Sequence, residues 1–155
     1  DRVPCYGAFA MGRTARDVEV YLEAVGRPYE SVDDGTFLIQ PSGEGMPPIA
    51  VRADDPVVFK VDIGPISTAD PSRLGGLFKR LLEFNANDLL FCAYGIREER
   101  IILSAALPLE NLDLNEIQAV VADIELAVLM QVPQLMDLAR PPSSSRKRPS
   151  VRPNA

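Results

Sequence analysis

The sequence predicts a single α+β domain in which helices pack on an antiparallel sheet, with the elements in α-β-β-β-α-β-β-α order. Three observations lead to this fold class. Helical spacing of apolar residues appears in three segments, at 14–25, 71–88 and 113–138. Short runs rich in β-branched and aromatic residues lie between these segments. The chain has 155 residues, of which 46% are hydrophobic and 25% charged, as expected for one globular domain.

The first helix is expected to begin at Thr14. Thr14 and Asp17 form a T-x-x-D capping pattern, in which each side chain can accept a hydrogen bond from the backbone of the other. Helical spacing places the apolar residues of this segment on one face: Ala15, Val18, Leu22 and Val25. Gly26 and Pro28 then end the helix.

Three short strands are expected next, at residues 36–40, 49–52 and 57–63. The turn signals Asp33-Asp34-Gly35 and Asp54-Asp55-Pro56 bound them, and residues 41–48 form a looser loop. Paired aspartates can also bind a metal ion. The turn explains them better, because no third cluster of ligands accompanies them.

The second helix is expected to begin with Asp70 as N-cap and Pro71 at the first helical position. Its apolar stripe consists of Leu74, Leu77, Phe78, Leu81 and Leu82. Gly75 and Gly76 interrupt the helix, and each costs about 1 kcal/mol relative to alanine. Two explanations stay open: either the helix is imperfect, or another surface packs closely against its backbone there.

A hairpin and a long third helix are expected to complete the domain. The hairpin has strands at 89–96 and 101–107, joined by the charged turn 97–100. Asp113 with Glu116 forms a capping box at the start of the third helix. Pro133 is expected to kink or end this helix, with one last turn beyond it.

The sequence predicts no catalytic, cofactor-binding or metal-ligating residue and no cofactor. Without histidine, the Ser-His-Asp and Cys-His nucleophile systems and His-ligated zinc sites are excluded. The two cysteines, Cys5 and Cys92, are too few for a thiolate zinc site, and Cys92 is expected to be a small buried side chain. We therefore expect a protein that is not an enzyme, and keep carboxylate-only catalysis as a minor hypothesis.

The chain is expected to divide into three parts: an N-terminal extension of uncertain order (1–12), a folded domain (13–139) and a basic tail with the composition of disorder (140–155). The tail carries five basic residues and no acid, which leaves 11 basic and 22 acidic residues before it. An acidic domain repels nucleic acid and anionic membrane surfaces and suits a basic or neutral partner segment. The tail is expected to be a solvated appendage, with binding of nucleic acid or another anionic partner as the alternative. No apolar run reaches the length of a membrane span. With two cysteines no disulfide framework is expected, which fits a cytoplasmic protein.

Two stretches resemble a known superfamily: "LFKRLLEFNAND" at 77–88 and "FCAYGIREERIILSAALPLENLDLNE" at 91–116. Over residues 14–139 the chain resembles the type III secretion chaperones, and most closely their YbjN-type, "sensory transduction regulator" branch. The resemblance implies a bacterial, homodimeric, non-catalytic module that holds an extended segment of a partner protein. The alternative is a regulatory or scaffold subunit of a larger bacterial complex.

The resemblance and the apolar pattern together suggest two surfaces. By analogy with helix-mediated dimers, the dimer interface is expected at Leu74, Gly75, Leu77, Phe78 and Leu81. Apolar residues also occupy both faces of the predicted strands, and one face needs a cover other than the helices. The expected partner-binding sheet consists of Phe37, Ile39, Ile101 and Leu103. Its partner would be a basic, partly apolar segment, and residues 146–152 of the tail are a competing occupant.

Overall fold

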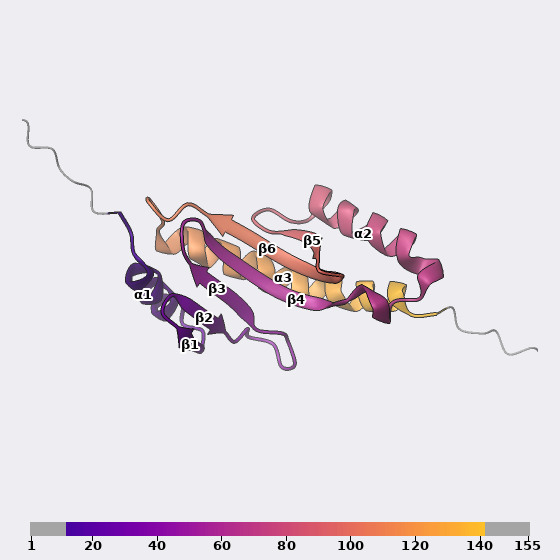
Figure 1. Cartoon of the computed structure of the whole chain (residues 1–155), viewed down its shortest axis with the longest axis horizontal. Coiled ribbons are helices and arrows are strands. Elements are labelled where there is room, and N and C mark those ends of the chain that lie inside the picture. Colours follow the sequence, from indigo (N-terminus) through magenta and orange to yellow (C-terminus); the bar gives the residue numbers. More distant parts are fainter. Residues whose placement is uncertain (1–11, 142–155) are drawn as a thin grey trace, which may run out of the picture.

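The computed structural model describes residues 12–141, so the expected N-terminal extension and basic tail lie almost wholly outside the described residues. The described part contains three α-helices and six strands (Figure 1). In chain order these are α1 (Ala15–Val25), β1 (Tyr29–Asp33), β2 (Thr36–Ile39), β3 (Ile49–Ala53), β4 (Val57–Pro65), α2 (Leu74–Asn87), β5 (Ala93–Arg97), β6 (Arg100–Leu107) and α3 (Leu114–Ala139).

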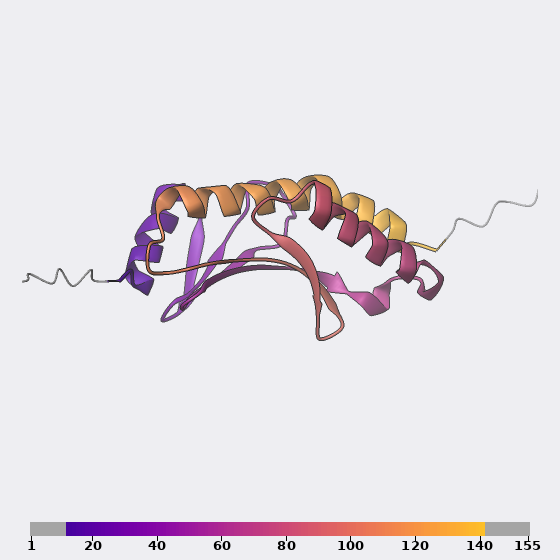
Figure 2. The same cartoon turned by 90° about the horizontal axis from the view of Figure 1, so that it is seen from above.

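The six strands form one antiparallel sheet in the order β1-β2-β3-β4-β6-β5. All three helices lie on the same face of this sheet, with α3 along its length and α1 and α2 near the two ends of α3 (Figure 2). This arrangement confirms the predicted α+β class. The 57–63 strand and the hairpin belong to one antiparallel sheet, as predicted, and β4 pairs with β6 and β6 with β5.

The structure contains one strand more than the predicted order. β1 was missed because its sequence, YESVD, shows no apolar alternation, and four of its five residues are exposed. The strand forms because Asp34 and Gly35 make a tight turn that brings it against β2, where Glu30 pairs with Leu38. Gly35 has a φ of 90°, which favours glycine over other residues.

Several other boundaries differ from the prediction, among them the starts of α2 and β5 and the ends of β3 and β4. β5 begins at Ala93 rather than residue 89, because residues 90–92 form a loop whose backbone bonds to α3 instead of β6. α3 continues through Pro133 to Ala139. The side chain of Gln134 donates a hydrogen bond of 2.9 Å to the carbonyl of Met130. This bond stabilises the helix next to Pro133, which has no N–H to donate.

Helix ends follow the predicted capping residues. Thr14 with Asp17 and Asp113 with Glu116 both form complete capping boxes, and Gly26 ends α1 in the left-handed conformation. Asp70 accepts a hydrogen bond from the Ser72 backbone, although it caps a short 3-10 turn at 71–73 that leads into α2. These contacts fix where each helix starts relative to the sheet.

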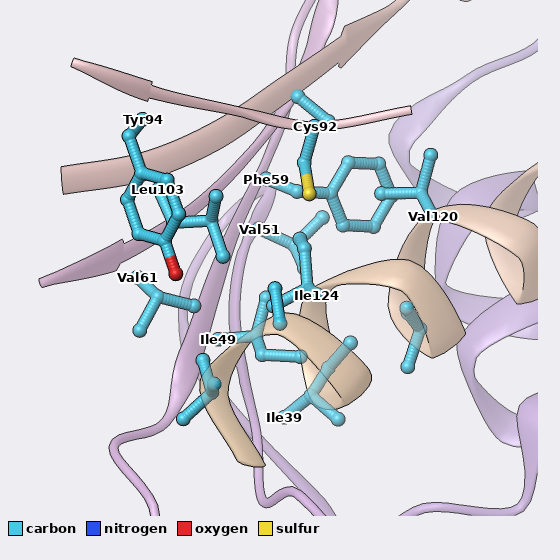
Figure 3. Packing of buried hydrophobic residues seen from close by; sticks show 14 of the residues in the cluster. Ile39, Ile49, Val51, Phe59, Val61, Cys92, Tyr94, Leu103, Val120 and Ile124 are labelled. Atoms are coloured by element: carbon cyan, nitrogen blue, oxygen red, sulfur yellow. The ribbon is translucent and has the colours of Figure 1, made fainter. Parts of the chain in front are cut away.

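The core lies between the sheet and the helices (Figure 3). Inward residues of the strands, such as Val51, Phe59 and Leu103, meet Val120 and Ile124 of α3, and all five are at most 1% exposed. Among the helices of the described residues, only α3 is long and apolar enough to cross a membrane, judged by length and composition alone. A core helix has the same features, and here the inner side of α3 packs in the core.

Candidate protein-binding surfaces

The four residues of the expected partner-binding sheet lie in the core. Phe37, Ile39, Ile101 and Leu103 are at most 6% exposed and pack under the helices. The predicted alternation of the strands is correct, but the choice of face is wrong. The face without helices carries the alternate residues, including Leu38 and Ile102, which are half-buried.

The residues expected at a dimer interface divide between the core and the surface. Leu77 and Leu81 are 2% and 5% exposed and belong to the core. Gly75 is exposed, and a Cβ atom added to it would meet no atom within 4 Å, so no close packing within the described chain requires a glycine there. Leu74 and Phe78 are partly buried against the core.

An apolar hollow of about 270 Å³ lies between the outer side of α2 and β5. Phe78, Leu82, Tyr94 and Ile96 contribute to its lining. Leu82 and Ile96 are 68% and 51% exposed, which is high for large aliphatic side chains that lie next to each other. This hollow can receive apolar side chains from a second surface.

The outer edge of β5 is closed at Tyr94 by a side chain. Asn85, in the last turn of α2, accepts a hydrogen bond of 2.7 Å from the Tyr94 N–H and donates one of 3.0 Å to the Tyr94 carbonyl. The amide thus replaces the partner strand that this edge lacks. No signal in the sequence indicates this contact, because the pattern does not link Asn85 to a strand nine residues away.

The loop before β5 is closed by a second side chain. One carboxylate oxygen of Asp123, on α3, accepts hydrogen bonds from the backbone N–H groups of Leu90, Phe91 and Cys92 at 2.8–3.2 Å. The sequence signal for this role is that Asp123, like Glu125, interrupts the mostly apolar run VVADIEL of α3.

The opposite edge of the sheet, β1, is open. Gln40 donates a backbone hydrogen bond to the Pro28 carbonyl, and Glu30 pairs with Leu38, so alternation turns the backbone groups of Tyr29 and Ser31 away from β2. Within residues 12–141, no hydrogen bond reaches the outward N–H or C=O of either residue. An unpaired edge of this kind can pair with another extended chain.

A small acidic hollow lies beside this open edge. It has a volume of about 170 Å³ and lies between α1 and the β1–β2 hairpin. Glu19, Asp33 and Asp34 line it together with one basic residue, Arg16. The local charge therefore favours a basic segment next to β1.

Cys92 does not have the properties of a nucleophile. Burial raises the pKa of its thiol, and the hydrogen bond from its Sγ to Asp123 at 3.2 Å raises the pKa further. The thiol therefore stays protonated near neutral pH. The described residues contain no group of three His, Cys, Asp or Glu side chains placed to hold a metal ion.

Comparison with known proteins gives a consistent picture. The CesT_Tir_1 family model matches residues 11–141. A chain of the heterodimeric ExoU–SpcU complex from the type III secretion system of Pseudomonas aeruginosa superimposes with a TM-score of 0.60 at 18% identity, covering 81% of this chain and 99% of that chain. YbjN from E. coli, a putative transcription regulator, gives 0.52 at 14% identity over 74% of this chain and 87% of its own. None of the curated proteins compared matches.

Proposed function

Because this chain belongs to the CesT_Tir_1 family, we propose that it is a non-catalytic bacterial protein-binding module that holds an extended segment of a partner protein in the cytoplasm. The fold is that of secretion chaperones and of YbjN, as predicted from the sequence. A fold alone does not specify a ligand, so the proposal rests on the surfaces of this chain.

The observation that carries the proposal is the difference between the two sheet edges. At β5, Asn85 occupies the outward backbone groups of Tyr94. At β1, the outward groups of Tyr29 and Ser31 have no partner among the described residues. An extended partner segment is therefore expected to add to the sheet beside β1, with main-chain hydrogen bonds providing affinity.

The neighbouring side chains indicate the chemistry of the segment. Glu19, Asp33 and Asp34 beside β1 favour lysine or arginine in the partner. Val32, which is 54% exposed, offers an apolar contact on the same strand. These features agree with a basic, partly apolar segment, as expected from the acidity of the domain.

Peptide binding to edge variants tests this proposal. Ser31→Pro removes one outward N–H of β1, and proline is tolerated at such edge positions. We expect this substitution to weaken binding of cationic, partly apolar peptides by about tenfold, which corresponds to about 1.4 kcal/mol. Isothermal titration calorimetry with a peptide library would measure the change.

Ile96→Pro is the matched control, since it removes an outward N–H from the opposite edge strand. Affinity should stay within a factor of about two in this variant, a change well below 1 kcal/mol. Equal losses in both variants, with unchanged circular dichroism, would contradict strand addition at β1. Absence of binding by the unsubstituted protein across the library would contradict the proposed function itself.

A homodimer through α2 and β5 is the second part of the proposal. Leu82 and Ile96 line the hollow between these elements and are too exposed to be explained by packing within one chain. Gly75 and Gly76 leave open space on α2, which allows a second helix to approach its backbone. Both features lie on the far side of the molecule from β1, so dimerisation leaves the open edge accessible.

A further inference from the structure

A groove of about 400 Å³ between α2 and α3 has no place in the proposed function. It lies on the other side of α2 from the β5 hollow and is lined by Leu89, Leu126 and Met130 together with several polar residues. Leu126 and Met130 are 60% and 58% exposed. Within the described residues, an apolar strip of α3 is therefore uncovered.

A polar side chain at this groove lacks a partner. Gln131 is only 7% exposed, and its Oε1 is buried without a hydrogen bond from any residue between 12 and 141. A buried amide oxygen of this kind is costly unless a donor reaches it. Gln131 also lines the groove, so a rotation of its side chain would present this oxygen to a donor on an occupant of the groove.

The charges of the groove favour a cationic occupant. Asp88 and Asp123 line it, against one basic residue, Arg80. Arg80 is already engaged, because it forms an ion pair with Glu83 at 3.3 Å and donates a hydrogen bond of 3.1 Å to Gln134. Lysine and arginine fit such a site, since their aliphatic stems can cover Leu126 and Met130 while their heads donate hydrogen bonds.

The basic tail starts beyond the end of this groove that Arg80 and Gln134 line. The carbonyl of Ala139, the last residue of α3, accepts a hydrogen bond of 2.9 Å from the Asp70 N–H, just before α2. The chain thus leaves α3 where α2 and α3 meet. Along the axis of α3, Gln131 lies about 12 Å from Ala139, and Asp123 lies about 24 Å from it. Arg146, Lys147 and Arg148 can reach about 20–26 Å from Arg140 when extended.

We propose that residues 142–155 fold back into the α2–α3 groove, with the Arg146-Lys147-Arg148 cluster beside Gln131, Asp88 and Asp123. The attachment of the tail to α3 gives it a high effective concentration at the groove. The tail then neutralises part of the acidic domain and covers the exposed apolar residues of α3. This contact is independent of the β1 edge and does not rest on the proposed function.

Paramagnetic relaxation in the full-length chain tests the contact. A nitroxide is attached to Ser150→Cys in a Cys5→Ser background, while the buried Cys92 stays unlabelled, and the methionine methyl groups carry ¹³C. We expect the label to attenuate the Met130 signal strongly and the Met46 signal, from the β2–β3 loop, only weakly. Replacing Arg146, Lys147 and Arg148 by serine should remove the difference, as should about 1 M salt, where charges are screened beyond about 3 Å.

Variants on the groove side provide a second measurement. Gln131→Leu keeps the approximate shape of the side chain and removes the acceptor, and Asp88→Asn removes an exposed charge. Both should reduce the attenuation of Met130. Equal attenuation of Met46 and Met130, or attenuation that persists in the serine variant, would overturn the proposal. Attenuation in a mixture with label and isotope on different molecules would assign the groove to a second copy and would equally overturn it.

Discussion

Glu125 joins three segments that are distant in the sequence. Its carboxylate forms a bidentate pair with Arg27, at 2.9 and 3.0 Å, and accepts hydrogen bonds from the N–H and hydroxyl of Ser42. The contacts connect the end of α1 and the β2–β3 loop to α3. The Glu125 side chain is 15% exposed and that of Arg27 37%, so solvent screens the pair only in part.

These contacts give stability a defined pH dependence. The hydrogen bonds from Arg27, followed by those from Ser42, hold the pKa of Glu125 below its ordinary value of 4.5, although burial opposes them. A depressed pKa in the folded state means that the carboxylate stabilises the fold above the unfolded-state pKa. That contribution is lost as the pH falls through the lower pKa of the folded state.

We therefore predict that Glu125→Gln lowers the free energy of unfolding by about 1–2 kcal/mol near pH 7, because charge-assisted hydrogen bonds are lost. The difference from the unsubstituted protein should shrink as the pH falls below 4.5. Urea denaturation at several pH values measures both quantities. Glu110→Gln, at an exposed position of the β6–α3 loop, is the control and should change little. A pH-independent difference would contradict the assigned role.

At the scale of elements, the two edges of the sheet are managed differently. The Asn85 amide takes the place of a neighbouring strand at β5, whereas β1 has exposed side chains and backbone groups that no residue between 12 and 141 pairs. The length of α2 is important here, because Asn85 reaches Tyr94 only if α2 remains helical as far as Asn85. The position of a helix end thus decides which edge of the sheet can accept another chain.

Asn85→Ala should lower the free energy of unfolding by about 1–3 kcal/mol, because it leaves two backbone groups of Tyr94 without partners. Asn87→Ala is the matched control. Asn87 is the same residue type two positions further on, is exposed, and bonds only to the Glu83 carbonyl of its own helix. Hydrogen exchange at the Tyr94 amide should accelerate in the first variant and not in the second. Similar behaviour of the two variants would show that the amide does not protect β5.

The elements that the sequence predicted well are those with local signals. Both capping boxes, the turn at 97–100 and the alternation of β4 and β6 depend on neighbouring residues, and the structure has them. β1 could not be predicted, because pairing with β2 stabilises this strand and its own residue composition does not favour a strand. The sheet face was misassigned for a related reason: strands with apolar residues on both sides do not indicate which side the helices cover.

The binding surfaces were only partly accessible to sequence reasoning. The acidity of the domain and the apolar character of α2 were visible in the sequence. The open edge at Tyr29 and Ser31, however, depends on the order of strands in the sheet, which places β1 at one end and β5 at the other. The contact between Asn85 and Tyr94 depends on how α2 docks. Both follow from tertiary structure, for which no local pattern exists.

At the scale of the whole molecule, the helices leave one sheet face and the outer side of α2 uncovered (Figures 1 and 2). A stable interface between proteins buries about 800 Å² per partner. The α2–β5 side provides the exposed Leu82 and Ile96, the partly buried Phe78 and a hollow that can receive side chains. In a symmetric dimer, each chain would insert the same residues into the hollow of the other.

We predict that light scattering at high micromolar concentration gives the mass of a dimer, and that Leu82→Asp gives the mass of a monomer. Leu82 is 68% exposed, so the substitution should leave the free energy of unfolding of the monomer almost unchanged. Leu77→Asp is the contrasting variant, because Leu77 is 2% exposed and a buried, unpaired charge should unfold the chain. A monomeric mass for the unsubstituted protein would contradict the dimer. If Leu82→Asp remained dimeric, the subunits would associate through a different surface, and the exposed apolar residues of α3 would be the next surface to substitute.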